Sequence, residues 1–152
     1  MIKSWIAAAI GAVTGTRRAS AGQDPGAHDT KKYAAYYRLA ASWLLLRNDG
    51  RSMAEYFADH QYRRVAVFGL GRLGMCLLSE LRDSGVEVRY GIDRNAEHFS
   101  YLDLEVVPPD GPFEAVDAVV VTPFFECERL VLDLEYRTSA KVVSLEDIVL
   151  SL

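Results

Sequence analysis

The stretch that decides the fold is Val65-Ala66-Val67-Phe68-Gly69-Leu70-Gly71-Arg72-Leu73-Gly74. An apolar run of strand length leads into a Gly-x-Gly-x-x-Gly loop, and leucines at helical spacing follow the loop. Three glycines at this spacing are weak evidence alone, but a strand before them and a helix after them make the motif more specific. The order of strand, glycine loop and helix predicts an α/β unit whose turn can approach a phosphate.

The segment after the loop continues this pattern. One face of the expected helix is apolar and consists of Leu73, Leu77, Leu78 and Leu81. Residues 84–85, Ser-Gly, end the helix, and residues 86–92 form a second expected strand that leads directly into Asp93. Asp93 lies 19 residues after Gly74 (93 − 74 = 19), close to the spacing of about 20 at which an acidic residue binds a ribose hydroxyl.

Each residue of this motif has an expected role. Gly69 allows a tight turn, Gly71 lets a phosphate approach the backbone, and Gly74 lets the helix lie close to the strand. Asp93 can accept hydrogen bonds from ribose hydroxyls and would repel a 2′-phosphate, although the adjacent Arg94 opposes that repulsion. The alternative is a strand, turn and helix that use glycine only for packing.

The remaining chain predicts three further strands and two further helices. We expect strands over residues 104–107, 115–122 and 141–143, a helix over residues 125–138, and a capped helix from residue 144 onward. No segment of helix length separates the second strand from residues 104–107, so the crossover between them is short. Alternating strands and helices predict a small Rossmann-like parallel sheet flanked by helices.

Ligands of such sheets bind beyond the carboxyl ends of the strands. The candidate binding residues at this edge are Gly69, Gly71, Arg72, Leu73, Gly74, Asp93, Arg94, Thr122, Pro123 and Phe124, and residues 144–145 lie near them. Thr122 can bind a ribose, a phosphate or a ring edge, or it can cap the next helix. Phe124 can stack on a base or line the pocket. Arg72 can reach a phosphate or remain a surface arginine.

The part of the chain before this body has two regions. Residues 5–13 form an apolar run that is too short to span a bilayer, which takes about 20 residues. For residues 1–20 three alternatives stay open: a cleaved signal peptide, a helix on a membrane surface or a partner, and a loosely packed tail. Residues 20–29 resemble a flexible linker. The expected division is residues 1–29, a helical extension over 30–62, and the nucleotide-binding domain over 63–152.

The helical extension contains an aromatic stripe. Over residues 30–48 the stripe consists of Tyr33, Tyr36, Tyr37, Ala40, Trp43, Leu44 and Arg47. We expect this stripe to be buried against the body; a ligand platform and a dimer surface are the alternatives. Residues 52–55, Ser-Met-Ala-Glu, have the form of a capping box and predict a second short helix that ends near His60.

Composition narrows the classes of function. The chain has 152 residues, 50% of them hydrophobic, and a net charge of −4. This is typical of one globular domain and argues against general nucleic-acid binding. Cys76 and Cys127 have no zinc-site spacing, so we expect two reduced core cysteines, no metal, and a cytoplasmic location with membrane association left open.

The catalytic residues remain unassigned, and whether the chain is an enzyme stays open. The sequence contains no Tyr-x-x-x-Lys pair after the motif and no Gly-x-Ser-x-Gly, and its glycine loop lacks a Lys-Ser/Thr ending. His98 is the one histidine that follows closely on Asp93, and its alternative interpretation is an exposed loop residue.

The segments also occur in a familiar order. After a helix with Tyr-Tyr come Ser-x-x-Glu-Tyr-Phe, the glycine loop, Gly-Ile-Asp-Arg-Asn-Ala, Val-Asp-Ala-Val-Val-Val-Thr-Pro and Val-Val-Ser-Leu-Glu-Asp-Ile. Over residues 33–150 this order resembles small Rossmann-type proteins associated with bacterial surface-polysaccharide biosynthesis. The body is also similar to the nucleotide-sugar-binding domain of sugar acyltransferases, through Gly69, Gly71, Gly74 and Asp93. The catalytic repeats of those enzymes are absent from this sequence, so the resemblance implies binding without acyl transfer.

The residues and the resemblance together predict a nucleotide- or nucleotide-sugar-binding module of surface-polysaccharide biosynthesis. NAD is the other candidate cofactor. The alternatives are a stand-alone NAD-dependent oxidoreductase or epimerase-like enzyme, and a scaffolding partner of a glycosyltransferase with a vestigial site. The expected partners are a nucleotide-containing small molecule, a polysaccharide-biosynthesis protein and a second copy of the chain.

Overall fold

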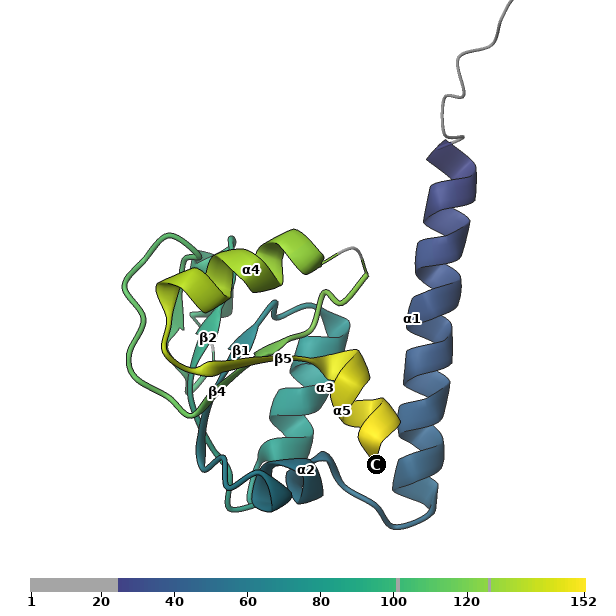
Figure 1. Cartoon of the computed structure of the whole chain (residues 1–152), viewed down its shortest axis with the longest axis horizontal. Helices are drawn as coiled ribbons and strands as arrows, with labels where there is room; N and C mark the ends of the chain where they lie inside the picture. Colours follow the sequence, from purple (N-terminus) through teal and green to yellow (C-terminus); the bar gives the residue numbers. More distant parts are fainter. Residues whose placement is uncertain (1–24, 101, 126) are drawn as a thin grey trace, which may run out of the picture.

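The computed structural model describes residues 25–100, 102–125 and 127–152 (Figure 1). Its sheet has five strands, all parallel, in the order β3-β2-β1-β4-β5. The strands are β1 (Arg64–Phe68), β2 (Glu87–Ile92), β3 (Val106–Val107), β4 (Ala118–Val121) and β5 (Lys141–Ser144). The predicted α/β class with a parallel sheet is confirmed, and the strand order is compatible with a Rossmann-like fold.

Helices cover both faces of the sheet. The helices are α1 (Pro25–Asn48), α2 (Met53–Asp59), α3 (Arg72–Leu81), α4 (Glu128–Arg137) and α5 (Leu145–Ser151). Helices α1, α2, α3 and α5 share one hydrophobic cluster, and α4 packs into a second cluster on the opposite face (Figure 1). The sheet is therefore buried between two helical layers, as parallel sheets require.

Strand β1 shows why the sequence folds in this way. Val65 and Val67 belong to the cluster on the α3 side, whereas Ala66 and Phe68 belong to the cluster on the α4 side. Successive side chains of a strand point to opposite faces, so a continuous apolar run can bury both faces at once. The same alternation holds in β4, which pairs with β1 in the middle of the sheet.

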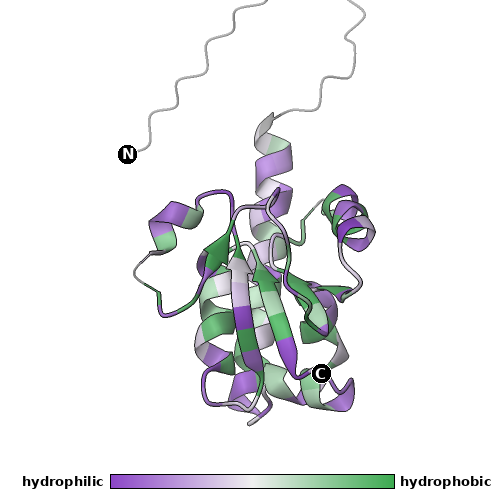
Figure 2. Ribbon diagram, turned by 90° about the vertical axis from the view of Figure 1, so that its left-hand side faces the viewer, coloured by the Kyte–Doolittle hydropathy of each residue, from purple (hydrophilic) through white to green (hydrophobic). Residues whose placement is uncertain are grey.

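Helix α1 begins earlier than the sequence predicted. The prediction began it at Thr30 and treated residues 20–29 as a linker, but the helix begins at Pro25. Proline suits the first helical position because its missing N–H needs no partner there and its φ is already helical. Figure 2 shows the first, mostly hydrophilic turns of α1 projecting beyond the end of the sheet.

A buried carboxylate fastens α1 and α2 to α3. Glu80, whose side chain is 8% exposed, accepts hydrogen bonds from Nε1 of Trp43 at 2.6 Å, the backbone N–H of Met53 at 2.7 Å and Oγ of Ser52 at 3.2 Å. Its Oε1 also lies 3.6 Å from the guanidinium of Arg47. Because these donors come from α1 and from the start of α2, one side chain of α3 holds both helices.

Helix α2 forms through the predicted capping box. The Ser52 side chain accepts from the backbone of the first turn, and the Glu55 side chain accepts from the backbone N–H of Ser52 at 2.9 Å. Two N–H groups without helical partners are thereby satisfied.

The crossover from β2 to β3 is short, as predicted. A single 3₁₀ turn, η1 (Ala96–Phe99), replaces the usual crossover helix, and β3 contains two residues instead of the expected four. Helix α4 begins at Glu128, not at Phe125.

The start of β4 gives one pH-dependent prediction. Oδ2 of Asp117 accepts hydrogen bonds from the backbone N–H groups of Arg64 and Arg63, each at 2.8 Å, and these bonds hold the pKa of Asp117 below its usual value of 3.8. Stability from a lowered carboxyl pKa is present at neutral pH and is lost as pH falls through the folded-state pKa. We expect Asp117→Ala to lower the free energy of unfolding by about 1 kcal/mol at pH 7. Urea denaturation should show a smaller difference at pH 3; an equal difference at both pH values would contradict this account.

Candidate functional site

A cavity of about 710 Å³ lies at the carboxyl ends of the strands, between the glycine loop and α1. Its lining consists of Lys32, Tyr33, Tyr36, Tyr37 and Ala40 from α1, Gly69, Gly71, Arg72 and Leu73 from the glycine loop and α3, and Thr122 and Pro123 after β4. We call it the loop cavity. Its volume is in the range of small-molecule sites, and it opens where parallel sheets bind ligands.

Two of the loop glycines are required by the protein itself. Gly69 has a φ of +86°, and a Cβ there would lie 2.7 Å from Cδ of Pro123 and 2.9 Å from Oγ1 of Thr122. A Cβ on Gly74 would meet the carbonyl oxygen of Gly69 well inside 3.0 Å, a separation that real Cβ contacts essentially never show. These glycines let the chain turn out of β1 and let α3 approach it closely.

At position 71, by contrast, neither a close contact nor the backbone conformation requires a glycine. A Cβ built on Gly71 meets no described atom within 4 Å, and its φ of −67° is one that any residue adopts. Gly71 is the N-cap of α3, yet among the described residues no side chain caps this helix. Glycine is tolerated at this position, but serine, asparagine and aspartate are preferred because their side chains satisfy a helical N–H. Gly71 lines the loop cavity together with Arg72 and Leu73, the first residues of α3, so the start of this helix lies at the cavity.

Asp93 closes the loop from the end of β2. Its Oδ2 accepts a hydrogen bond from the N–H of Leu70 at 2.8 Å, and its Oδ1 accepts one from the N–H of Asn95 at 2.9 Å. The Leu70 side chain packs over Gly91 of β2, and the N–H of Gly69 donates to the carbonyl oxygen of Ile92 at 2.8 Å, so the loop is also fixed to the second strand itself. An ionised carboxylate has about four acceptor positions, so two internal bonds leave acceptor capacity on Asp93.

Thr122 and Phe124 support the loop from within the protein. Oγ1 of Thr122 lies 2.6 Å from the carbonyl oxygen of Gly69 and 3.2 Å from that of Phe68, so its hydroxyl hydrogen is used internally. Thr122 does not cap α4, whose N-cap is Cys127. Phe124 is 7% exposed, and its ring packs against the ring of Tyr36 at a tilt of 47°, with centroids 4.8 Å apart. Of this segment, Thr122 and Pro123 line the loop cavity and Phe124 lies behind it.

Two cations lie on opposite walls of the loop cavity. Arg72, the first residue of α3, and Lys32 of α1 are both exposed and both belong to the lining. Arg94 is exposed beside Asp93, and His98 is exposed on η1; neither belongs to the lining. The cavity is therefore positively charged near the glycine loop and suited to an anionic ligand.

The aromatic stripe of α1 is not buried as a whole against the body, as the sequence predicted, and part of it lines the loop cavity, where the alternative of a ligand platform places it. The predicted aromatic stripe is divided between two surfaces: Trp43 and part of Tyr36 face the core, whereas Tyr33 and Tyr37 are exposed and line the cavity. Burial raises the pKa of Tyr36, and the nearby Cys127 adds to the effect. Its phenol therefore stays protonated at neutral pH and can donate a hydrogen bond but cannot act as a base.

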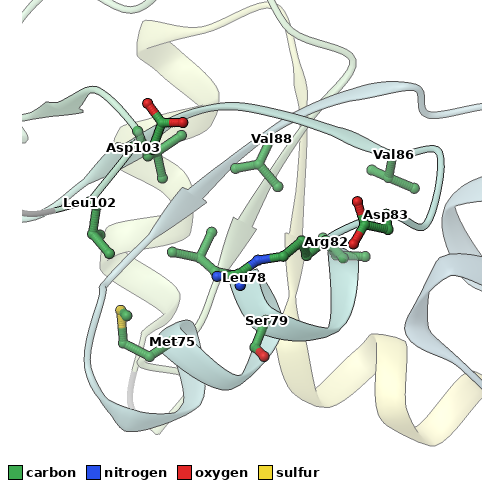
Figure 3. Close-up of a pocket in the computed structure, with 11 residues that line it drawn as sticks. Met75, Leu78, Ser79, Arg82, Asp83, Val86, Val88, Leu102 and Asp103 are labelled. Carbon is green, nitrogen blue, oxygen red and sulfur yellow. The ribbon is translucent and has the colours of Figure 1, made fainter.

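A second cavity, of about 800 Å³, lies between α3 and the outer part of β2. Figure 3 shows Met75, Leu78 and Arg82 along one side of α3, with Val88 and Leu102 opposite them. This groove lies on the side of α3 that the shortened β2–β3 crossover leaves uncovered. Its lining combines apolar side chains with Ser79, Arg82, Asp83 and Asp103, and it includes no residue of the glycine loop. Within the described ranges, no three His, Cys, Asp or Glu side chains gather as metal ligands.

Comparisons with known proteins give no match to a protein-family model, a curated protein or a solved structure. The fold and the geometry of the loop cavity therefore carry the functional interpretation. In the part of the chain that the structure describes, no helix combines the length and the apolar character needed to cross a membrane.

Proposed function

We propose that this chain binds a nucleotide-containing small molecule at the glycine loop, either a nucleotide-sugar or a dinucleotide such as NAD, as a binding module of surface-polysaccharide biosynthesis. The observation that carries the proposal is Gly71. This glycine lines the loop cavity, has no steric or conformational reason within the described chain, and exposes the start of α3. A ligand that must approach the backbone closely would explain why position 71 has no side chain.

A phosphate is the group that suits this position. The first N–H groups of a helix have no partners within the helix, and the helix dipole adds partial positive charge there. Arg72 and Lys32 add full positive charges on the two walls of the cavity. Together these groups favour an anion of the size of a phosphate or pyrophosphate.

Asp93 supports the nucleoside part of the proposal. The carboxylate is held beside the loop by Leu70 and Asn95, so it is already oriented before a ligand binds. Its remaining acceptor positions can take ribose hydroxyls, and its charge favours NAD over NADP.

A scaffold without a ligand is the second candidate function. It is favoured by the internal hydrogen bonds of Thr122 and Asp93, which give both residues a structural role. A scaffold gives no reason for the missing side chain at position 71, and substitution at this position separates the two functions.

We expect Gly71→Val to lower the affinity for the ligand at least 100-fold while the protein stays folded. The valine side chain would occupy the space in which a phosphate approaches the start of α3, and the loss of a glycine N-cap should cost only about 1 kcal/mol. A thermal-shift panel with NAD, NADP, UDP, GDP, UDP-glucose and GDP-mannose measures both effects. A ligand at 100 times its dissociation constant adds about 2.7 kcal/mol of stability to the wild-type chain.

Cys76→Val is the matched control, because Cys76 is exposed on the same helix and lies outside the cavity lining. It should keep the full ligand-induced shift. The proposal is overturned if none of these nucleotides stabilises the wild-type chain, or if Gly71→Val keeps the same shift as the wild type.

A further inference from the structure

The wall of the loop cavity opposite the glycine loop comes from one face of α1. Lys32, Tyr36 and Ala40 lie at i, i+4 and i+8, and Tyr33 and Tyr37 form a parallel row at i and i+4. Residues at this spacing share a face of a helix. The face is held in place because the ring of Tyr36 packs against the ring of Phe124, which lies three residues after the end of β4.

Within this wall, two tyrosines have uncovered rings. Tyr33 is 70% exposed and Tyr37 is 75% exposed, although both line the cavity. Tyr36, between them in sequence, is half-buried against the core. Two large aromatic side chains on the wall of a cavity beside a cationic loop form a surface on which a ring can stack, with Lys32 at its edge.

The position of this wall identifies the part of the ligand that it contacts. Asp93, the expected ribose-binding residue, does not line the loop cavity, whereas Thr122 and Pro123, after β4, do. The cavity therefore extends from the phosphate position toward β4, away from the end of β2. A group in the cavity lies on the side of the phosphates that is far from the Asp93-bound ribose.

We propose that α1 is the second wall of the binding site, and that Tyr33 and Tyr37 bind a ring joined to the terminal phosphate of the nucleotide. The proposal rests on nucleotide binding at the glycine loop. The ring is the sugar of a nucleotide-sugar or the nicotinamide riboside of a dinucleotide, since both attach a ring through the same phosphate. Tyr33 and Tyr37 then determine the preference for a ligand that carries such a ring over the bare nucleoside diphosphate.

The test measures binding of paired ligands by isothermal titration calorimetry: UDP against UDP-glucose, GDP against GDP-mannose, and ADP against both ADP-ribose and NAD. We expect the wild-type chain to bind the ring-bearing member of one pair more tightly. The double variant Tyr33→Ala/Tyr37→Ala should lose at least tenfold in affinity for that ligand and stay within about twofold for its bare diphosphate. If the ligand that binds most tightly is a nucleotide-sugar, the ring is a sugar; if it is NAD, the ring is the nicotinamide riboside.

Leu44→Ala/Leu45→Ala is the matched control. These leucines are 61% and 63% exposed on the same helix and lie outside the cavity lining, so their removal should leave both affinities unchanged. Melting temperatures of both double variants report that the fold is intact.

Two outcomes overturn the proposal and differ in what they say about the site. If bare and ring-bearing ligands bind the wild type equally, or if the tyrosine variant weakens both equally, α1 does not bind the ring. Nucleotide binding at the loop then still stands, provided that Gly71→Val abolishes it. If no diphosphate binds the wild-type chain, the proposed function fails and this inference fails with it.

Discussion

Glu80→Ala should lower the free energy of unfolding by about 4 kcal/mol, the loss typical of breaking a buried ionic and hydrogen-bonded network. The carboxylate is almost fully buried and accepts from Trp43, Met53 and Ser52. Alanine would remove the acceptor of these three donors at a site that is largely closed to water, so the donors would lose their hydrogen bonds. Glu80→Gln keeps one acceptor oxygen and should cause an intermediate loss.

The measurement is urea denaturation followed by the fluorescence of Trp43. The chain has two tryptophans, so a Trp5→Phe background makes Trp43 the sole reporter. Glu135→Ala, at an exposed position of α4, is the control and should change stability by less than about 0.5 kcal/mol. A reduced denaturant dependence in Glu80→Ala would show that α1 unfolds separately. Equal stabilities of Glu80→Ala and Glu135→Ala would contradict the anchoring role.

Gly74→Ala should destabilise the chain by about 3 kcal/mol, in the upper range for overpacking. Helix propensity alone predicts the opposite sign, because alanine is better than glycine in a helix interior by about 1 kcal/mol. The added Cβ would collide with the carbonyl oxygen of Gly69, which is itself bound by the hydroxyl of Thr122. The carbonyl cannot move away without loss of that hydrogen bond.

Gly71→Ala is the matched control for Gly74→Ala, since it adds the same methyl group in the same loop where no described atom is near. It should cost no more than about 1 kcal/mol, as expected for an N-cap position. Thermal and urea denaturation of the two variants measure the difference. Equal stabilities would show that α3 can shift outward, and that the close packing of helix and strand at Gly74 is not required.

The sheet could be predicted from the sequence because its strands are buried on both faces. Residues 65–68 and 118–121 are continuous apolar runs, and the glycine loop fixes the direction of the chain after the first of them. The capping box at Ser52 was predictable for a different reason, because its hydrogen bonds join residues only two and three positions apart. The start of α1 was placed too late because glycine and polar residues after Pro25 resemble a linker, although proline at the first helical position was a usable signal.

The site was only partly predictable, because long-range contacts decide it. Tyr33, Tyr36 and Tyr37 form one stripe in the sequence, and only the packing of α1 separates the half-buried ring of Tyr36 from the exposed rings of Tyr33 and Tyr37. Glu80 looks like an ordinary surface residue of a helix, yet the indole N–H of Trp43 needed an acceptor somewhere. Thr122 and Phe124 were expected near the ligand because they follow a strand. The spacing of residues in the sequence does not reveal that Thr122 bonds to the Gly69 carbonyl or that Phe124 is buried.

The direction of α1 has a consequence for anything that binds its first turns. His28, in these turns, contacts Phe125 near the carboxyl edge of the sheet, so the helix begins at the end of the molecule where the loop cavity lies. A surface or protein that bound these turns would hold any ligand of the cavity at an effective concentration on the order of millimolar, as for groups joined by a short linker. Delivery of a ligand between that surface and this chain would then need no diffusion through bulk solution.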